Sequence, residues 1–291
     1  MEITIKNSEI AYTVLTAGAE GRSLRDLKTG HEYYWHADPA YWGGCAPILF
    51  PATGGCWNGT YRLNGKEYNM PKHGFVKKRE WNVETQTEDA VTFSYCPNKE
   101  ELEFFPFPCK VIVAYRLEGR KLIADFRVEN SGDHTMYFQM GGHPGFVLDD
   151  FAEDMKISGF LRLEGNPQSL LRATEQGCTE AQRYPVPFNE EGLVPLCMET
   201  FANEALILDN HQISAATLLR NDKTPVARVE SSAPVWLFWA PQGVHAPFVC
   251  AEPWYGLCDP IGFEGPVEDR PFINALEAGK TWEGGYTVEV F

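Results

Sequence analysis

The feature of this 291-residue chain that most limits its possible folds is a repeated pattern of short segments in which apolar and polar residues alternate. A period of two places successive side chains on opposite faces of a β-strand, so each segment predicts a strand with one buried face. Three pairs of such segments flank turn residues: 3–5 with 10–14, 61–63 with 66–68, and 111–117 with 122–128. We predict a β-hairpin at each, most strongly where Asn64-Gly65 forms the turn.

Strand patterns continue through the rest of the chain, in segments 206–208, 216–219, 226–229, 235–239 and 286–290. Helical periodicity is restricted to two stretches, 98–102 and 149–154, where we predict single helical turns. No linker, charge run or internal repeat divides the sequence. The sequence therefore predicts an all-β sandwich or barrel, built as one domain over residues 1–291.

The charge balance and cysteine pattern narrow the class of protein. Lys and Arg number 25 against 40 Asp and Glu, a net charge of −15, which disfavours nucleic acid and anionic membrane surfaces as partners. No apolar run approaches the ~20 residues of a membrane span, and the first residues do not resemble a signal peptide. The eight cysteines form no C-x-x-C pair. We expect reduced thiols and a cytoplasmic monomer or homodimer.

Three segments carry ionisable residues in unusual settings. His143 lies in the run GGHPGF at 141–146, after an alternating strand pattern, where small residues allow a close approach of backbone or ligand. His73 lies in PKHGF, and Glu252 follows the apolar run PFVCA. Removal from water raises the pKa of a carboxyl group toward values useful for a general base. These residues predict one acid–base site that acts on a ligand with a flat apolar face.

A metal site is the alternative, because two histidines and a carboxylate match a facial metal triad in composition. The three residues are far apart in the sequence, however, and no H-x-H or H-x-x-E pair occurs among them. The sequence therefore favours proton transfer without a metal or another cofactor. We predict that the other five histidines are surface residues: His31, His36, His134, His211 and His245.

Four segments together resemble one known family. They are WGGCAPILFP at 42–51, the hairpin and following residues at 60–81, YFQMGGHPGF at 137–146 and FVCAEPWYG at 248–256. In this order they look like the aldose 1-epimerase (galactose mutarotase-like) family, and most like its branch associated with lactose and tagatose operons. The resemblance implies a large antiparallel β-supersandwich with few short helices and a cleft that binds a sugar.

The resemblance also implies a reaction, the interconversion of the α and β anomers of a free hexose. Glu252 matches the residue that removes the proton of the anomeric hydroxyl, and His143 matches the residue that protonates the ring oxygen. His73 matches a second histidine that contacts the sugar near the ring oxygen. Independently of the family, mutarotation needs a base and an acid that face one pyranose. Trp254 and Trp57 are among the aromatic residues on which a sugar could pack.

The sequence departs from the family in its sugar-binding residues. Gly55 stands where the family usually carries an arginine, and Asn203 or Glu204 takes the place of an aspartate. These differences leave open whether the substrate, or the activity itself, is that of the family.

Two other functions therefore remain open. Lys72 belongs to a basic cluster with residues 77–79, which would suit a phosphorylated substrate and thus a hexose-6-phosphate 1-epimerase. A carbohydrate-binding or sensing protein without catalytic activity is the non-enzymatic alternative, because a fold does not determine a function.

Overall fold

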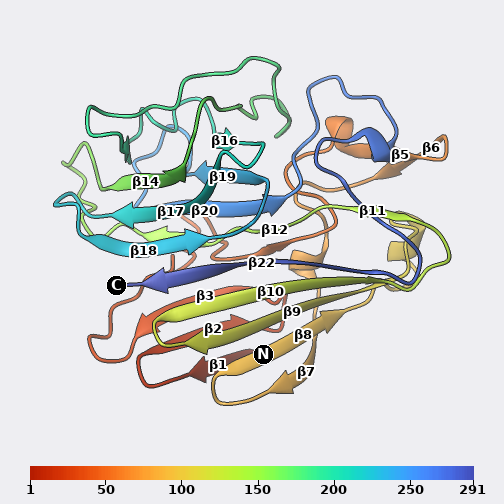
Figure 1. Ribbon diagram of the computed structural model, residues 1–291, viewed down its shortest axis with the longest axis horizontal. Coiled ribbons are helices and arrows are strands. Elements are labelled where there is room, and N and C mark those ends of the chain that lie inside the picture. The colour runs from red at the N-terminus through yellow and green to blue at the C-terminus, as the bar shows by residue number, and fades with distance from the viewer.

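The computed structural model describes all 291 residues and consists almost entirely of antiparallel strands. The largest sheet has nine strands, which follow one another across the sheet as β15 (Val194–Pro195), β14 (Phe160–Gly165), β17 (Ile213–Leu219), β18 (Pro225–Glu230), β22 (Thr281–Val290), β10 (Lys121–Asn130), β9 (Cys109–Glu118), β8 (Ala90–Tyr95) and β7 (Asn82–Gln86). In Figure 1 the strand β22, which is last in the sequence, lies in the middle of this sheet.

Smaller sheets complete the fold. The six-stranded sheet contains β16 (Leu206–Leu208), β19 (Val235–Trp239), β20 (Phe248–Tyr255), β12 (Met140–Gly142), β4 (Ile48–Leu49) and β13 (Gly145–Val147). Three further sheets are formed by β1 (Glu2–Lys6), β2 (Ile10–Leu15) and β3 (Gly21–Asp26), by β5 (Thr60–Leu63) and β6 (Lys66–Asn69), and by β11 (Met136–Phe138) and β21 (Asn274–Leu276). The helical segments are four 3₁₀ turns, η1 (Trp57–Gly59), η2 (Val76–Lys78), η3 (Glu101–Glu103) and η4 (Val267–Asp269).

The predicted all-β class and the three predicted hairpins are confirmed, as β1–β2, β5–β6 and β9–β10. The helical turn expected at 98–102 corresponds to η3, whereas the one expected at 149–154 is wrong. There the side chain of Asp149 pairs with Arg220, and Asp150 accepts a hydrogen bond from the backbone of Asn221. These contacts hold residues 149 and 150 against a neighbouring turn, and the segment does not form a helix.

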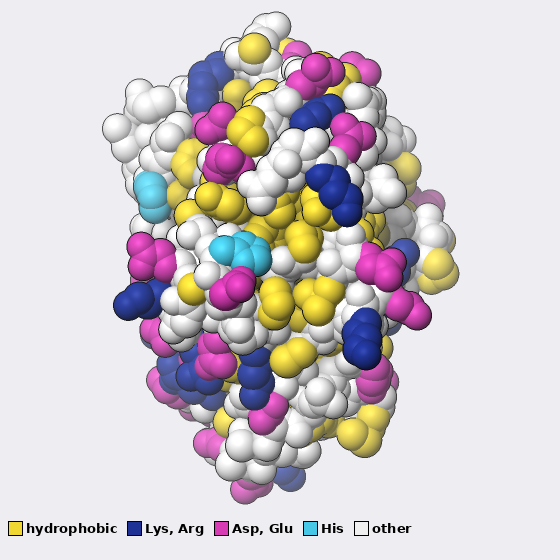
Figure 2. All heavy atoms as spheres, turned by 90° about the vertical axis from the view of Figure 1, so that its right-hand side faces the viewer, with side chains coloured by type: hydrophobic (Ala, Val, Ile, Leu, Met, Phe, Trp, Pro, Cys, Tyr) yellow, Lys and Arg dark blue, Asp and Glu magenta, His cyan; other side chains and the backbone are white.

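The sheets pack as a sandwich around one main core. A single cluster of 70 buried residues contains side chains from the nine-, six- and three-stranded sheets, among them Phe126, Val288, Phe238, Phe146 and Tyr12. On one side of the molecule hydrophobic side chains also reach the surface, bordered by charged ones (Figure 2). All eight cysteines are free, and none of the helical segments has the length and hydropathy to cross a membrane.

One arginine ties the three-stranded sheet to the centre of the large sheet. The guanidinium of Arg120 donates to Asp26 Oδ2 at 2.7 Å, to the hydroxyl of Tyr33 at 2.8 Å and to the carbonyl of Val290 at 2.9 Å. The backbone N–H of Thr29 and the Arg120 guanidinium hold the pKa of the buried Asp26 carboxyl well below its usual value. A lowered pKa means that the ionised carboxylate stabilises the folded state.

We expect Asp26→Asn to lower the free energy of unfolding by about 1.5–3 kcal/mol at neutral pH, the usual range for a hydrogen bond to a charged group. The difference from the unsubstituted protein should shrink as the pH falls below about 4, because the carboxyl is then increasingly protonated in the unfolded chain and its stabilising effect is lost. Urea unfolding at several pH values measures both. Asp125→Asn, at an exposed ion pair, is the control and should change stability by no more than about 0.5 kcal/mol. Equal effects of the two substitutions would contradict the role of Asp26.

Candidate active site

The carboxylate of the site lies in the centre of a buried strand. The apolar run PFVCA, which precedes Glu252, suggested a strand that ends there, but β20 continues through Pro253 to Tyr255, so Glu252 is an interior residue of the strand. Its side chain is 0% exposed. Because side chains alternate along a strand, Cys250, Glu252 and Trp254 share one face of β20.

His143 faces this carboxylate from the neighbouring strands. β12 and β13 both pair with β20, and the pairing keeps one register across the gap between them. The same register places His143, in that gap, opposite Glu252. Gly141 lies opposite Trp254, and a Cβ atom at Gly141 would come within 2.7 Å of the indole ring. Gly141, two residues before the histidine, therefore makes room for the tryptophan whose indole N–H binds the carboxylate.

His143, Glu252 and Trp254 lie at the floor of a cavity of about 450 Å³. The six-stranded sheet contributes Leu49, Leu237, Trp239, Glu252 and Trp254 to the lining, and His143 is beside them. Segments outside this sheet contribute the rest of the wall, including Glu20, Trp42, Lys72, His73, Lys77, Lys78 and Glu204. The cavity thus combines an acid–base pair with apolar surface and several charged groups.

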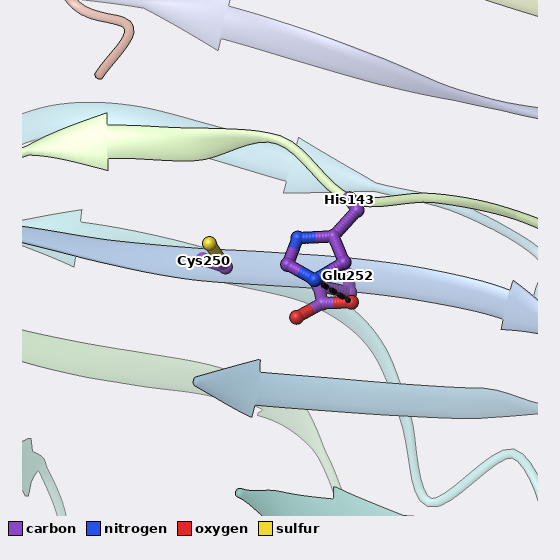
Figure 3. A group of neighbouring side chains, drawn as sticks. All are labelled: His143, Cys250 and Glu252. Carbon is purple, nitrogen blue, oxygen red and sulfur yellow. Dashed lines mark ion pairs between the residues drawn. The ribbon is translucent and has the colours of Figure 1, made fainter. Parts of the chain in front are cut away.

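The two central side chains are in direct contact. His143 Nε2 lies 3.3 Å from Glu252 Oε2, as Figure 3 shows, and the indole N–H of Trp254 donates to the same oxygen at 3.1 Å. The ring of Trp42 stacks on the His143 imidazole, with the ring centres 4.8 Å apart. This packing fixes the orientation of both ionisable groups.

Burial governs the protonation of the pair. It raises the pKa of Glu252 well above its usual value, and the hydrogen bond from Trp254 partly opposes this shift. Burial lowers the pKa of His143. Both shifts favour the uncharged forms of the two groups. The uncharged pair and the ion pair hold the same number of protons, and they differ only in whether the shared proton is on Oε2 or on Nε2.

His73 is held at the same cavity by a tight turn. Its backbone has a φ of +65°, and its N–H donates to the carbonyl of Gly54 at 2.8 Å. The N–H of Gly54 in turn donates to His73 Nδ1 at 3.1 Å, so a neutral ring carries its proton on Nε2. Burial, with the neighbouring His143 and Lys77, keeps the pKa of His73 well below its usual value. His73 therefore offers an N–H donor, and its ring centre lies 5.5 Å from that of His143.

The structure brings some of the predicted sugar-binding residues to the cavity and leaves others outside it. Lys72 and Glu204 line it, and Trp254 lines it while its indole N–H is bound to Glu252. Asn203 is exposed and does not line the cavity. Trp57 does not line it either, and its backbone N–H donates to Asp259. Of the two candidates to replace the aspartate, Glu204 is the one at the cavity.

The absence of a side chain at position 55 has a structural reason. A Cβ atom at Gly55 would lie 2.4 Å from the carbonyl oxygen of Gln176, because the segment at Gln176 and Gly177 packs against this backbone. A Cβ atom at Gly177 would lie 3.2 Å from Lys72 Nζ. Position 55 therefore carries no cation, and the ammonium group of Lys72 lies next to the segment that packs on it.

Several lining residues were not found from the sequence. Leu237 and Trp239 share one face of an apolar strand with Val235, but their segment gave no sign of a site. Glu20 had no distinguishing motif, and Leu49 was not singled out within the segment 42–51. Among the histidines expected at the surface, His36, His134 and His211 are exposed, whereas His31 and His245 are half-buried next to Asp149 and Ser158.

Comparisons with known proteins agree with this architecture. The sequence profile described as aldose 1-epimerase matches residues 1–282. The chain belongs to the aldose 1-epimerase family. It is 31% identical over 304 residues to the chromosomal protein LacX of Lactococcus lactis, with 100% of this chain and 99% of LacX covered.

Solved structures give the same result for the fold. A galactose mutarotase-like protein from Lactobacillus casei is 30% identical, with a TM-score of 0.94 and all of both chains covered. A galactose mutarotase related enzyme from Lactobacillus acidophilus is 29% identical, with a TM-score of 0.91 and 100% and 97% of the two chains covered. The expected galactose mutarotase-like supersandwich is confirmed.

In this member of the aldose 1-epimerase family, Trp254 donates a hydrogen bond to the Glu252 carboxylate, so its replacement should change the pKa of that group. We expect Trp254→Phe to raise the pKa of Glu252, because the substitution removes a hydrogen bond to the charged form. The acid limb of kcat/KM for anomer exchange should move to higher pH. Trp239→Phe alters another aromatic residue of the cavity that does not bond to Glu252, and should leave the limb in place. A limb unmoved by Trp254→Phe would show that the indole is only packing.

Proposed function

We propose that this protein is an aldose 1-epimerase of the cytoplasm that interconverts the α and β anomers of a hexose by acid–base catalysis. The observation that carries the proposal is the contact of 3.3 Å between His143 and Glu252 at the floor of an open cavity. A buried pair whose protonation states are coupled is suited to give and take protons at neighbouring atoms of one ligand. The family relationship supports the same chemistry.

The ion-pair form of the site starts the reaction. The Glu252 carboxylate removes the proton from the anomeric hydroxyl while the His143 imidazolium donates its proton to the ring oxygen. The bond between C1 and the ring oxygen breaks, and C1 becomes a carbonyl carbon. Rotation about the C1–C2 bond and reclosure on the other face give the second anomer. The reaction needs proton transfer alone, and His73 can donate its Nε2–H to the ring oxygen to hold the sugar in place.

The contact between the two side chains also explains how the site returns to its starting state. After ring opening, Glu252 holds a proton and His143 has lost one. Reclosure by the reverse transfers restores both, and in the empty site the proton passes directly between Oε2 and Nε2. A site that is closed to water at its floor thus needs no proton from solvent in each turnover.

The mechanism predicts large effects of two conservative substitutions. Glu252→Gln keeps the size of the side chain and removes the base, so kcat should fall by roughly 10²–10⁴-fold. His143→Asn should have a similar effect, and the double variant should be far from additive because the two groups act as a unit. Anomer exchange is measured by polarimetry or NMR across a panel of free hexoses.

Glu277→Gln, at an exposed loop position, is the control and should leave kcat unchanged. Chelators should not lower the rate. If Glu252→Gln stays within a few-fold of the unsubstituted protein while sugar binding persists, the non-catalytic sugar-binding function is the better one.

A second substrate class is favoured by one observation, the presence of Lys72, Lys77 and Lys78 together on the cavity wall. Burial, with the two neighbouring lysines, lowers the pKa of Lys77 to about 8, and its Nζ donates to the carbonyl of Lys72 at 3.1 Å. Such a group of ammonium donors suits the phosphate of a hexose 6-phosphate. Glu20 and Glu204 line the same wall, and their negative charges would repel a phosphate group.

The two substrate classes are separated by removing single lysines. If the phosphorylated sugar is the substrate, Lys77→Ala or Lys78→Ala should reduce kcat/KM for the 6-phosphate by roughly 10- to 150-fold, the worth of one hydrogen bond to a charged group. The rate with the free hexose should not change. Lys121→Ala, on an exposed strand position, is the charge-matched control. Equal effects on both substrates would leave the free sugar as the substrate.

A further inference from the structure

Two polar atoms of the acid–base pair have no partner. His143 Nδ1 and Glu252 Oε1 make no hydrogen bond. Both residues are buried, His143 with 8% of its surface exposed and Glu252 with none, so water cannot readily satisfy these atoms. Buried polar atoms are nearly always paired, and exceptions call for a bound water, an ion or a function. The direct transfer between the two side chains uses Nε2 and Oε2, so it gives Nδ1 and Oε1 no partner.

A third potential metal ligand lies close to the pair. Cys250 is two residues before Glu252 on β20 and points to the same face. Its Sγ, a nitrogen of His143 and an oxygen of Glu252 all lie within 4.8 Å of one another. In Figure 3 the ring nitrogen that does not contact Glu252 is on the side of the Cys250 sulfur, as is the free carboxylate oxygen. Imidazole, thiol and carboxylate thus surround one small volume.

We propose that this volume is an inhibitory site for a thiophilic divalent cation, with Zn²⁺ bound by His143, Cys250 and Glu252. Zinc accepts nitrogen, sulfur and oxygen ligands together, with bond lengths of about 2.0–2.3 Å in a tetrahedral arrangement. Donor atoms in such a site lie about 3.3–3.8 Å apart. The present separations of up to 4.8 Å need to shorten by up to about 1.5 Å for zinc to bind. Magnesium and calcium prefer oxygen ligands and should not compete.

Binding of the cation consumes the groups that the reaction needs. The thiol of Cys250 loses its proton to solvent as the metal–sulfur bond forms, and the metal takes a lone pair of the Glu252 carboxylate. A metal-bound carboxylate is a weaker base, and His143 is held by the same ion. Since His143 and Glu252 line the cavity, a bound sugar and the cation should exclude each other. This inhibitory effect rests on the proposed function, whereas the binding itself does not.

Cobalt(II) is the probe for binding, because it replaces zinc in such sites and its bond to a thiolate gives a charge-transfer band in the near ultraviolet. Titration of the metal-free protein should produce this band and saturate at one ion per chain. Cys250→Ala and Cys250→Ser should abolish the band. Cys258→Ala is the matched control, since Cys258 is also buried and lines the cavity, and the band should remain. No band, or a band that survives both Cys250 substitutions, overturns the proposal.

Activity measurements give the second test. Zn²⁺ should inhibit anomer exchange, a chelator should restore it, and Mg²⁺ should have no effect. In both Cys250 variants the zinc concentration that halves the rate should rise by about 100-fold or more, because loss of even an outer-sphere partner costs 10–100-fold in affinity. The basal rate should stay close to that of the unsubstituted protein. If that protein shows no anomer exchange at all, the proposed function fails while the cobalt titration still decides the site.

Discussion

The site depends on an ionisable pair placed inside a sheet, where neither member is stable as an isolated charge. A buried lone carboxylate or imidazolium costs several kcal/mol unless it is paired or neutralised. Here the register of β12 and β13 against β20 places Glu252 and His143 opposite each other, so that one proton shared between them cancels both charges. The backbone pairing of three strands therefore sets the chemistry of the cavity floor.

Neighbouring aromatic side chains hold Glu252 and His143 in contact. Trp254 binds one carboxylate oxygen, and Trp42 covers the imidazole. Gly141 leaves space for the indole of Trp254, which no residue with a Cβ atom could do without a shift of neighbouring atoms. The run of small residues around His143 thus has a packing purpose as well as a conformational one.

Much of this arrangement could be predicted from the sequence. Alternation gave the strands and hairpins, because a period of two directly reports which face is buried. His73, His143 and Glu252 stood out because each occupies an unusual local setting. The register that brings His143 opposite Glu252 could not be predicted, since it joins segments far apart in the chain. Trp239 and Leu237 were missed for a different reason, because an apolar strand residue that lines a cavity has the same sequence pattern as one in the core.

The central place of β22 in the large sheet has a consequence for biosynthesis. This strand lies between β10 and β18 yet follows both of them in the chain. While a ribosome still holds residues 281–290, the sheet consists of two halves whose inner edges carry unpaired backbone groups. Exposed edges of this kind recruit other strands, so the nascent chain is most prone to misassembly while β22 is still missing from the sheet. Closure of the sheet therefore waits for β22 even when every other strand is in place, and chaperones that shield strand edges would act in that interval.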